Sequence, residues 1–142
     1  MAELSRIRRF SEKGKPAEEL MEAELIEGLG LKGDRHADGS NRQLTLLRAE
    51  TAEWMRTRET PGLCFRRYQA NLEIRGLPEG SLMPDRKLTV GEAVVEITAE
   101  GKHCFPECGL FHSGEECRLS REGSCGRVMR GGRIRVGDFS QI

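Results

Sequence analysis

The sequence lacks an excess of charge of either sign, long apolar runs and internal repeats. Its 23 Lys and Arg residues balance 23 Asp and Glu residues, so the formal net charge is zero. A balanced chain has no global electrostatic attraction for nucleic acid or for an anionic membrane. No stretch approaches the roughly 18 apolar residues of a membrane span, and the N-terminus has no apolar signal-peptide core. We therefore expect a cytoplasmic protein with no nucleic acid and no membrane as a partner.

The length of 142 residues leaves room for one hydrophobic core, and we expect a single domain over residues 1–142. Seventeen glycines indicate many turns, which suits β-structure. Short apolar runs between these turns predict strands over residues 4–10, 43–47, 69–74, 87–90, 93–98 and 134–139. Residues 48–58 form the clearest helical pattern. Many short strands around one or two short helices predict a mainly β fold, a closed or partly open β-barrel.

Residues 17–29 fit two structures. Ala17, Met21, Leu25 and Leu29 recur at four-residue spacing, which is typical of a helix. Met21, Ala23 and Leu25 also alternate with glutamates, as in a half-buried strand. Two basic clusters, residues 6–9 and 130–135, are equally open to two interpretations. Each is either a small-anion site or a solvated charged face.

The five cysteines are an odd number, and four of them crowd into residues 104–125. In a reducing compartment they are more consistent with free thiols or metal ligands than with a disulfide framework. Three interpretations compete. One is a zinc site, with ligands among Cys104, Cys108, Cys117, Cys125, His103 and His112. The second is buried cysteines that act as small apolar side chains. The third is a reactive or metal-binding thiolate, because neighbouring Lys102, His103 and Arg118 would lower the pKa of a thiol.

Several segments together resemble the MOSC family, whose small bacterial members are related to the C-terminal domain of molybdenum cofactor sulfurase. Residues 30–37 read Gly-Leu-Lys-Gly-Asp-Arg-His-Ala and are similar to the family's glycine loop. Residues 42–47, 71–77 and 90–104 resemble the strand segments that lead to the family cysteine. Cys117, residues 127–128 and residues 131–138 complete the series, which spans about residues 14–138. The chain departs from the family at Ala70, where Glu often precedes the asparagine.

The resemblance implies a barrel related to the pyruvate kinase barrel domain, and it implies binding of the molybdenum cofactor, molybdopterin. Cysteine thiolates would hold sulfane sulfur or ligate molybdenum. The candidate catalytic residues are Cys104, Cys108 and Cys117, of which Cys104 and Cys117 are the candidate metal ligands. Cationic and amide groups would hold the phosphate and the pterin of the cofactor. The candidates are Arg35, His36, Arg42, Asn71, Lys102 and Arg127. The alternative for each arginine is a surface ion pair, and for His36 a structural hydrogen bond.

Three functions follow as hypotheses. In the first, the chain carries sulfur or the cofactor for molybdoenzyme maturation. Its partners would be a cysteine desulfurase, which alone would carry pyridoxal phosphate, and a molybdoenzyme or cofactor-biosynthesis protein. In the second, it is a molybdenum-dependent reductase of N-hydroxylated compounds that works with a separate reductase. In the third, it is a zinc-stabilised interaction module. An enzymatic role, as sulfurtransferase or oxidoreductase component, is left open by the sequence.

Overall fold

The structure of the protein is a computed structural model, which describes residues 2–11, 16–35, 37, 39, 43–57, 70–78, 81–100 and 124–141. In this part of the chain eleven strands and one helix occur. They are, in chain order, β1 (Ala2–Arg9), β2 (Glu18–Leu20), β3 (Glu22–Ile26), β4 (Gly30–Leu31), β5 (Leu44–Arg48), α1 (Ala49–Thr57), β6 (Leu72–Arg75), β7 (Lys87–Val90), β8 (Ala93–Glu100), β9 (Ser124–Arg130), β10 (Gly132–Arg135) and β11 (Phe139–Gln141).

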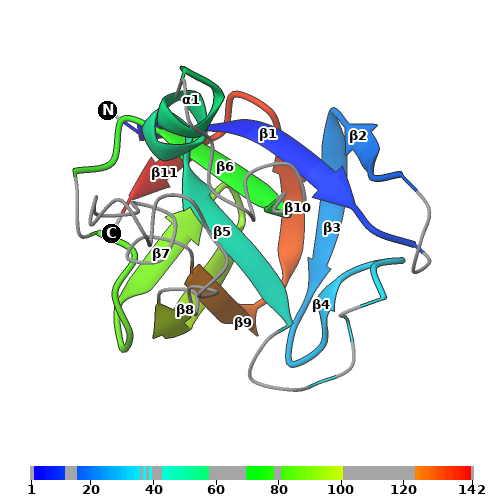
Figure 1. The fold of residues 1–142 in the computed structure, drawn as a ribbon. Coiled ribbons are helices and arrows are strands. Elements are labelled where there is room, and N and C mark those ends of the chain that lie inside the picture. Colours follow the sequence, from blue (N-terminus) through cyan, green and yellow to red (C-terminus); the bar gives the residue numbers. More distant parts are fainter. Residues whose placement is uncertain are drawn as a thin grey trace, which may run out of the picture.

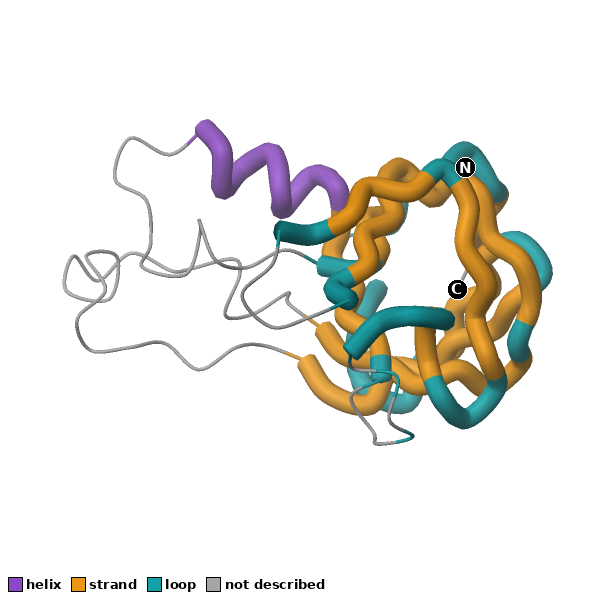
Figure 2. Tube along the Cα trace, turned by 90° about the vertical axis from the view of Figure 1, so that its right-hand side faces the viewer, coloured by secondary structure: helices purple, strands orange, loops and turns teal. Residues whose placement is uncertain are grey.

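Seven of these strands close into a barrel. The order around it is β11-β7-β8-β9-β5-β6-β1, and pairing of β1 with β11 completes the ring. β2 adds to the outside of β1, and β10, β3 and β4 form a second, three-stranded sheet. The ring of strands and the helix outside it are visible in Figures 1 and 2. Closure leaves no free edge in the ring itself, and it confirms the predicted barrel.

Alternation of side chains along the strands fills the barrel with aliphatic residues. Leu4, Ile7, Leu46, Leu72 and Ile97 are at most 1% exposed. The same core takes in Leu25 from β3 and Ile134 from β10, so both sheets share one apolar cluster. Polar neighbours of these residues in the sequence therefore point out of the barrel.

Gly126 of β9 is a tight point of this packing. A Cβ atom added there would lie 2.7 Å from Val95 Cγ1 and 2.9 Å from the carbonyl oxygen of Glu96. β8 and β9 can therefore approach each other closely only because this position has no side chain.

Helix α1 follows β5 directly and packs on β5 and β6. Ala49 and Ala52 are buried against the sheet. The first-turn carboxylate Glu50 accepts a hydrogen bond from the backbone N–H of Gly76 at 3.0 Å. The second carboxylate, Glu53, pairs with Arg75. The predicted helix is thus confirmed, and acidic side chains near its N-terminus fasten it to the turn after β6.

The ambiguous segment, residues 17–29, is extended as far as Ile26 and ends in a turn. It forms β2 and β3, with Leu25 1% exposed but Met21 74% exposed and Leu29 37% exposed. A helix would have placed these three on one buried face. The strand interpretation is confirmed, and the following glycine loop contributes the short strand β4.

The strand prediction near the C-terminus was wrong in its extent. The expected strand over residues 134–139 is two strands, because Gly137 adopts φ +97° within a turn between them. The N–H of Gly137 donates to the carbonyl oxygen of Leu4 at 2.6 Å. β10 therefore pairs with β3, whereas β11 pairs with β1 and β7. In addition, the sequence predicted no strand over residues 124–130, where the structure has β9.

Candidate functional site

The predicted site residues divide into two groups. The structure describes Arg35, Asn71 and Arg127. The remaining candidates lie outside the described residues: Cys104, Cys108, Cys117, His36, Arg42 and Lys102. The roles assigned to this second group stay predictions. The described part of the barrel nevertheless fixes where the cysteine-bearing segment is attached.

Residues 101–123 connect the end of β8 to the start of β9. Glu100 and Ser124, which flank this segment, are partners across the two strands. The Thr98 hydroxyl donates to the carbonyl oxygen of Cys125 at 3.3 Å. The buried Ser124 hydroxyl donates to the carbonyl oxygen of Leu82 at 2.8 Å. Both ends of the cysteine segment are therefore fixed at one place on the barrel.

That place adjoins a polar row, which consists of Thr45, Asn71 and Asp34 joined by hydrogen bonds. Cys125 of β9 is the partner of Thr45 on β5, and Thr45 is hydrogen-bonded to Asn71, just before β6. Asn71 in turn contacts β1 and the glycine loop. The row thus runs from the attachment of the cysteine segment to the loop that holds Arg35.

Asn71 is fully buried and makes hydrogen bonds with every polar group it has. Its Oδ1 accepts from the backbone N–H and from the hydroxyl of Thr45, at 2.9 and 3.0 Å. Its Nδ2 donates to the carbonyl oxygen of Arg8 at 3.0 Å and to Asp34 Oδ2 at 2.7 Å. Its own backbone N–H donates to Thr45 Oγ1, and its carbonyl oxygen accepts from the N–H of Arg8. Asn71 therefore joins β5, β1 and the glycine loop.

Residues 33–35 of the glycine loop are held by backbone hydrogen bonds. The N–H of Asp34 donates to the carbonyl oxygen of Leu31, and that of Arg35 to the carbonyl oxygen of Phe10 at 2.8 Å. Gly33 has φ +86°, and a Cβ atom there would lie 3.0 Å from Arg9 Cδ. Glycine is required at this position by both its conformation and the close approach of Arg9. The side chain of Arg35 is exposed.

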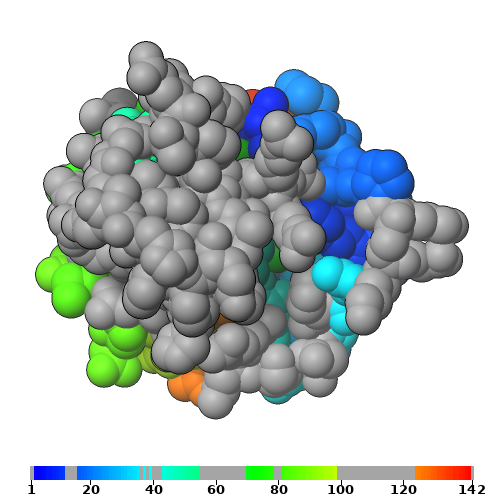
Figure 3. Space-filling view, in the orientation of Figure 1, coloured from blue at the N-terminus to red at the C-terminus, as the bar shows by residue number. Residues whose placement is uncertain are grey.

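In the space-filling view, β1, β2 and the part of the chain after β4 meet at one edge of the molecule (Figure 3). Arg9, the last residue of β1, pairs with Glu18 of β2 at 2.5 Å. The hydrogen bond from Arg9 lowers the pKa of Glu18 below its usual value. Asp34, in contrast to Arg35, is buried.

Arg127 lies elsewhere on β9 and already has a carboxylate partner. Its Nη2 and Nε are 2.7 and 2.9 Å from Glu96 Oε1. Its side chain is 43% exposed. The surface ion pair considered for this arginine is therefore present, while its role in holding a cofactor stays a prediction.

The basic cluster of residues 6–9 is neutralised by acidic neighbours. Arg6 lies 3.4 Å from Glu19, and Arg8 contacts both Glu19 at 3.3 Å and Glu73 at 2.6 Å. These contacts, with the pairing of Arg9, favour the charged-face interpretation over a small-anion site.

Within this cluster, Arg8 and Glu73 are a buried pair that the sequence did not reveal. Their side chains are 8% and 6% exposed. Arg8 Nη1 also donates to the carbonyl oxygen of Ala70 at 3.3 Å. Glu73 lies between two core residues of β6, so its position in the strand could have marked it as unusual. No local sequence feature identifies its partner Arg8, which is 65 residues away.

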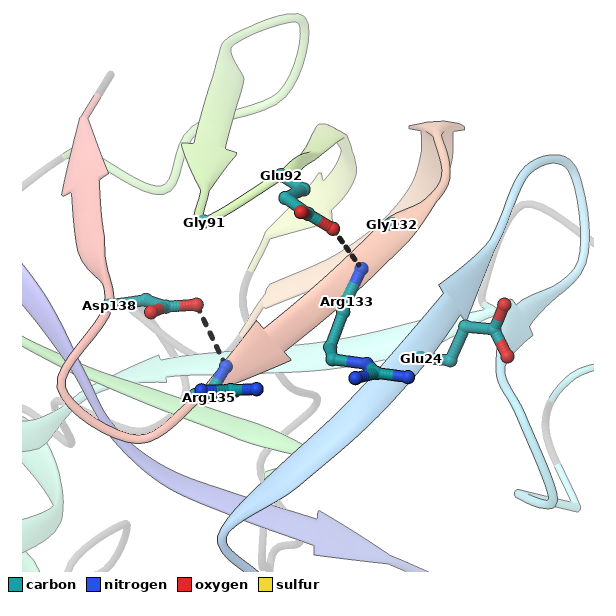
Figure 4. Close-up of a pocket in the computed structure, with 7 residues that line it drawn as sticks. All are labelled: Glu24, Gly91, Glu92, Gly132, Arg133, Arg135 and Asp138. Carbon is teal, nitrogen blue, oxygen red and sulfur yellow. Dashed lines mark hydrogen bonds between the residues drawn. The ribbon is translucent and has the colours of Figure 1, made fainter.

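A cleft of about 580 Å³ lies where β10, β3 and the turn between β7 and β8 meet (Figure 4). Glu92 accepts a hydrogen bond from the backbone N–H of Arg133 at 3.0 Å, and Asp138 from that of Arg135 at 2.8 Å. Arg135 also pairs with Glu22 at 3.1 Å. The carboxylates in this cleft thus satisfy N–H groups along β10, which is an edge strand in the described part of the chain.

No cluster of three or more potential metal ligands occurs among the described residues. Because the candidate zinc ligands other than Cys125 lie outside these residues, this finding leaves the zinc interpretation untested. In the same part of the chain, no helix has the length and apolar character needed to cross a membrane.

A closed seven-stranded barrel with one outer helix and a small second sheet defines the fold class. The MOSC domain family matches residues 33–139, and the chain belongs to this family. The resemblance seen in the sequence is thereby confirmed.

Solved structures share this fold. The YUAD protein from Bacillus subtilis superposes with a TM-score of 0.72 at 16% identity, covering 99% of this chain and 94% of that one. YiiM from Geobacillus stearothermophilus gives a TM-score of 0.64 at 14% identity, covering 99% and 74%. YiiM from Escherichia coli gives 0.55 at 18% identity, covering 99% and 71%. At such identities the similarity shows the fold alone. No curated protein matches the sequence.

Proposed function

We propose that this MOSC protein binds the molybdenum cofactor and carries sulfur, or the metal centre itself, on a cysteine thiolate during molybdoenzyme maturation. The observation that supports this best is the attachment of the cysteine segment. Both of its ends lie on β8 and β9, and Cys125 is the strand partner of Thr45 in the polar row. Three cysteines, Cys104, Cys108 and Cys117, thus belong to one segment anchored beside buried polar groups.

The chain's own chemistry would begin with sulfur transfer. A thiolate attacks the terminal sulfur of a persulfide on a cysteine desulfurase. A sulfur–sulfur bond forms to the carrier cysteine, and the bond to the desulfurase cysteine breaks, so that this cysteine leaves as a thiolate. No net oxidant is needed, because the sulfane sulfur keeps its oxidation level. Lys102 and His103 are the neighbours that would keep Cys104 ionised.

The described candidate side chains fit the phosphate end of the cofactor better than its pterin. Arg35 offers an exposed guanidinium on a loop whose backbone is fixed, which suits a phosphate or pyrophosphate group. Asn71 fits less well as a pterin contact, because its amide is saturated by Thr45, Arg8 and Asp34. When bound, the cofactor supplies the molybdenum centre that accepts sulfur or a thiolate ligand.

Mass spectrometry tests the sulfur-carrier function directly. The protein is incubated with a cysteine desulfurase and cysteine, and the cysteine-containing peptides are mapped without reduction. We expect the mass of one added sulfur atom on Cys104, Cys108 or Cys117, and its loss in the matching Cys→Ser variant. Cys125→Ser is the control, because Cys125 belongs to β9 rather than to the segment. Absence of added sulfur on all three cysteines would contradict the carrier function.

The same preparations separate the other two hypotheses. Turnover of an N-hydroxylated compound with an artificial electron donor by cofactor-loaded protein would favour the reductase. Stoichiometric zinc, with unfolding on chelation, would favour the interaction module.

A further inference from the structure

Asn71 has no hydrogen-bonding capacity left for a ligand. A side-chain amide offers two N–H donors and one oxygen with two lone pairs. All four are used: both donors by Arg8 and Asp34, and both lone pairs by Thr45. A pterin could bind to this amide only by displacing one of these buried partners, which would then lack a hydrogen bond.

The hydrogen bond from Asn71 Nδ2 to Asp34 connects Asn71 to the glycine loop. Asp34 Oδ2 is 2.7 Å from Asn71 Nδ2, and Asp34 is buried. The next residue, Arg35, has its N–H bound to the carbonyl oxygen of Phe10, just after β1. The N–H of Ala37 then donates back to the carbonyl oxygen of Asp34 at 3.1 Å. The loop is therefore attached to the barrel by the Asp34 side chain and by the N–H of the Asp34–Arg35 peptide, and the Ala37 N–H closes a turn within it.

We infer that Asn71 and Asp34 form a positioning pair that holds residues 33–35 so that the Arg35 guanidinium meets a phosphate or pyrophosphate group. The inference rests on the proposed function, which it deepens by assigning Arg35 to the anionic end of the ligand. Asn71 acts through Asp34 and does not touch the ligand. Asparagine is suited to this role because aspartate would lack both donors and would set two carboxylates against each other.

The geometry also explains why Asp34 is buried while its neighbour is exposed. The carboxylate of Asp34 enters the barrel's polar row, and the side chain of Arg35 remains in solvent. A fixed backbone lowers the conformational entropy that Arg35 loses when it binds an anion. Removing the anchor should therefore weaken anion binding even though no ligand contact is lost.

The test compares four substitutions by amide hydrogen exchange and by calorimetric titration with inorganic pyrophosphate. Asp34→Ala removes the acceptor, and Asp34→Ser leaves a polar group too short to reach Asn71. Asp34→Asn keeps one oxygen that can accept from Asn71, while it removes the charge and replaces the other oxygen by an NH2 group. Arg35→Ala removes the guanidinium but keeps the backbone anchor. Amides of β8 report whether each variant retains the barrel.

We expect Asp34→Ala and Asp34→Ser to speed exchange at the Arg35 amide about tenfold, the equivalent of about 1.4 kcal/mol. Both should weaken pyrophosphate binding about tenfold, with β8 exchange unchanged. Asp34→Asn should keep a slow Arg35 amide and bind at least as tightly as the wild type. Arg35→Ala should lose binding while the amide at position 35 stays protected.

Two results would overturn the positioning pair and leave the proposed function standing. One is unchanged loop exchange or unchanged pyrophosphate affinity in the Ala and Ser variants. The other is an Asn variant as impaired as the Ala variant, because the oxygen that accepts from Asn71 would then not be what holds the loop. A wild-type protein that binds no pyrophosphate and retains no pterin from a molybdenum-replete host would instead contradict the proposed function, and the inference with it.

Discussion

Replacing Glu73 by Ala removes the carboxylate that balances the charge of the buried Arg8 guanidinium. Arg8 and Glu73 lie 2.6 Å apart, and their side chains are 8% and 6% exposed. After the substitution, Arg8 keeps the carbonyl oxygen of Ala70 and the carboxylate of Glu19, each at 3.3 Å. Because Glu19 is 56% exposed, solvent screens much of its attraction for Arg8. The buried positive charge of Arg8 is left with these two weaker partners alone.

Breaking a buried ion pair by removing one member typically lowers the free energy of unfolding by about 3–5 kcal/mol. Because Arg8 keeps two weaker partners, we expect Glu73→Ala to lower it by about 3 kcal/mol. Glu53→Ala is the matched control, since it removes a glutamate that pairs with Arg75 where both side chains are 45% exposed. The expected loss for this exposed pair is under about 1 kcal/mol. The double variant Arg8→Met with Glu73→Leu should recover most of the stability lost in Glu73→Ala, because it leaves no unpaired charge.

Urea unfolding followed by circular dichroism measures these differences, provided the slope of free energy against denaturant is unchanged. The reasoning would be refuted if Glu73→Ala destabilised the protein no more than Glu53→Ala. It would also be refuted if the double variant were less stable than the single one.

Three further predictions concern packing, pH and the outer arginine. Gly126→Ala should lower the free energy of unfolding in urea by about 3 kcal/mol, because its Cβ would lie 2.7 Å from Val95 Cγ1. Gly28→Ala has φ +70° but open space around its Cβ, so it should cost about 1 kcal/mol. Equal losses in the two variants would argue against overpacking at Gly126. The pKa of Glu18 is lowered from 4.5 by Arg9, so its contribution to stability is present above about pH 4.5 and is lost as the pH falls through the lower folded value. Nuclear magnetic resonance titration of Glu18 should show a midpoint below 4.5 that returns toward 4.5 in Arg9→Met, and identical midpoints would contradict this. Arg127→Ala should change the free energy of unfolding by less than about 1 kcal/mol, because the pair of Arg127 with Glu96 is partly solvated. The same variant should retain less pterin on purification. A pterin content equal to that of the wild type would show that Arg127 is not part of the cofactor site.

Local pattern predicted most of the barrel. Alternating or β-branched runs identified β1, β5, β7 and β8, and helical periodicity identified α1. In these elements the buried side chains are the apolar ones, so the periodicity of apolar residues is sufficient to identify each element. β9 was mostly missed because Cys125, Gly126 and Arg127 carry no strand signal, and Gly126 is there for contact with Val95. The break at Gly137 was missed because its positive φ serves a connection to β1.

The candidate site was predictable to a smaller extent. Resemblance singled out Asn71 and Arg35, but not that Asn71 is saturated by groups from β1, β5 and the glycine loop. Arg8 and Glu73 meet only because β1 and β6 are neighbours in the closed ring. Such pairings depend on barrel topology, which a single sequence does not encode locally.

The most direct test of the central claim is the molybdenum and pterin content of the protein purified from a molybdenum-replete host. Metal analysis and fluorescence of the oxidised pterin are measured on the same sample of wild-type protein and of the Cys104→Ser and Cys117→Ser variants. We predict molybdenum and pterin in equal amounts in the wild type, and loss of molybdenum in at least one variant. Protein without molybdenum or pterin, but with one zinc per chain, would contradict the account.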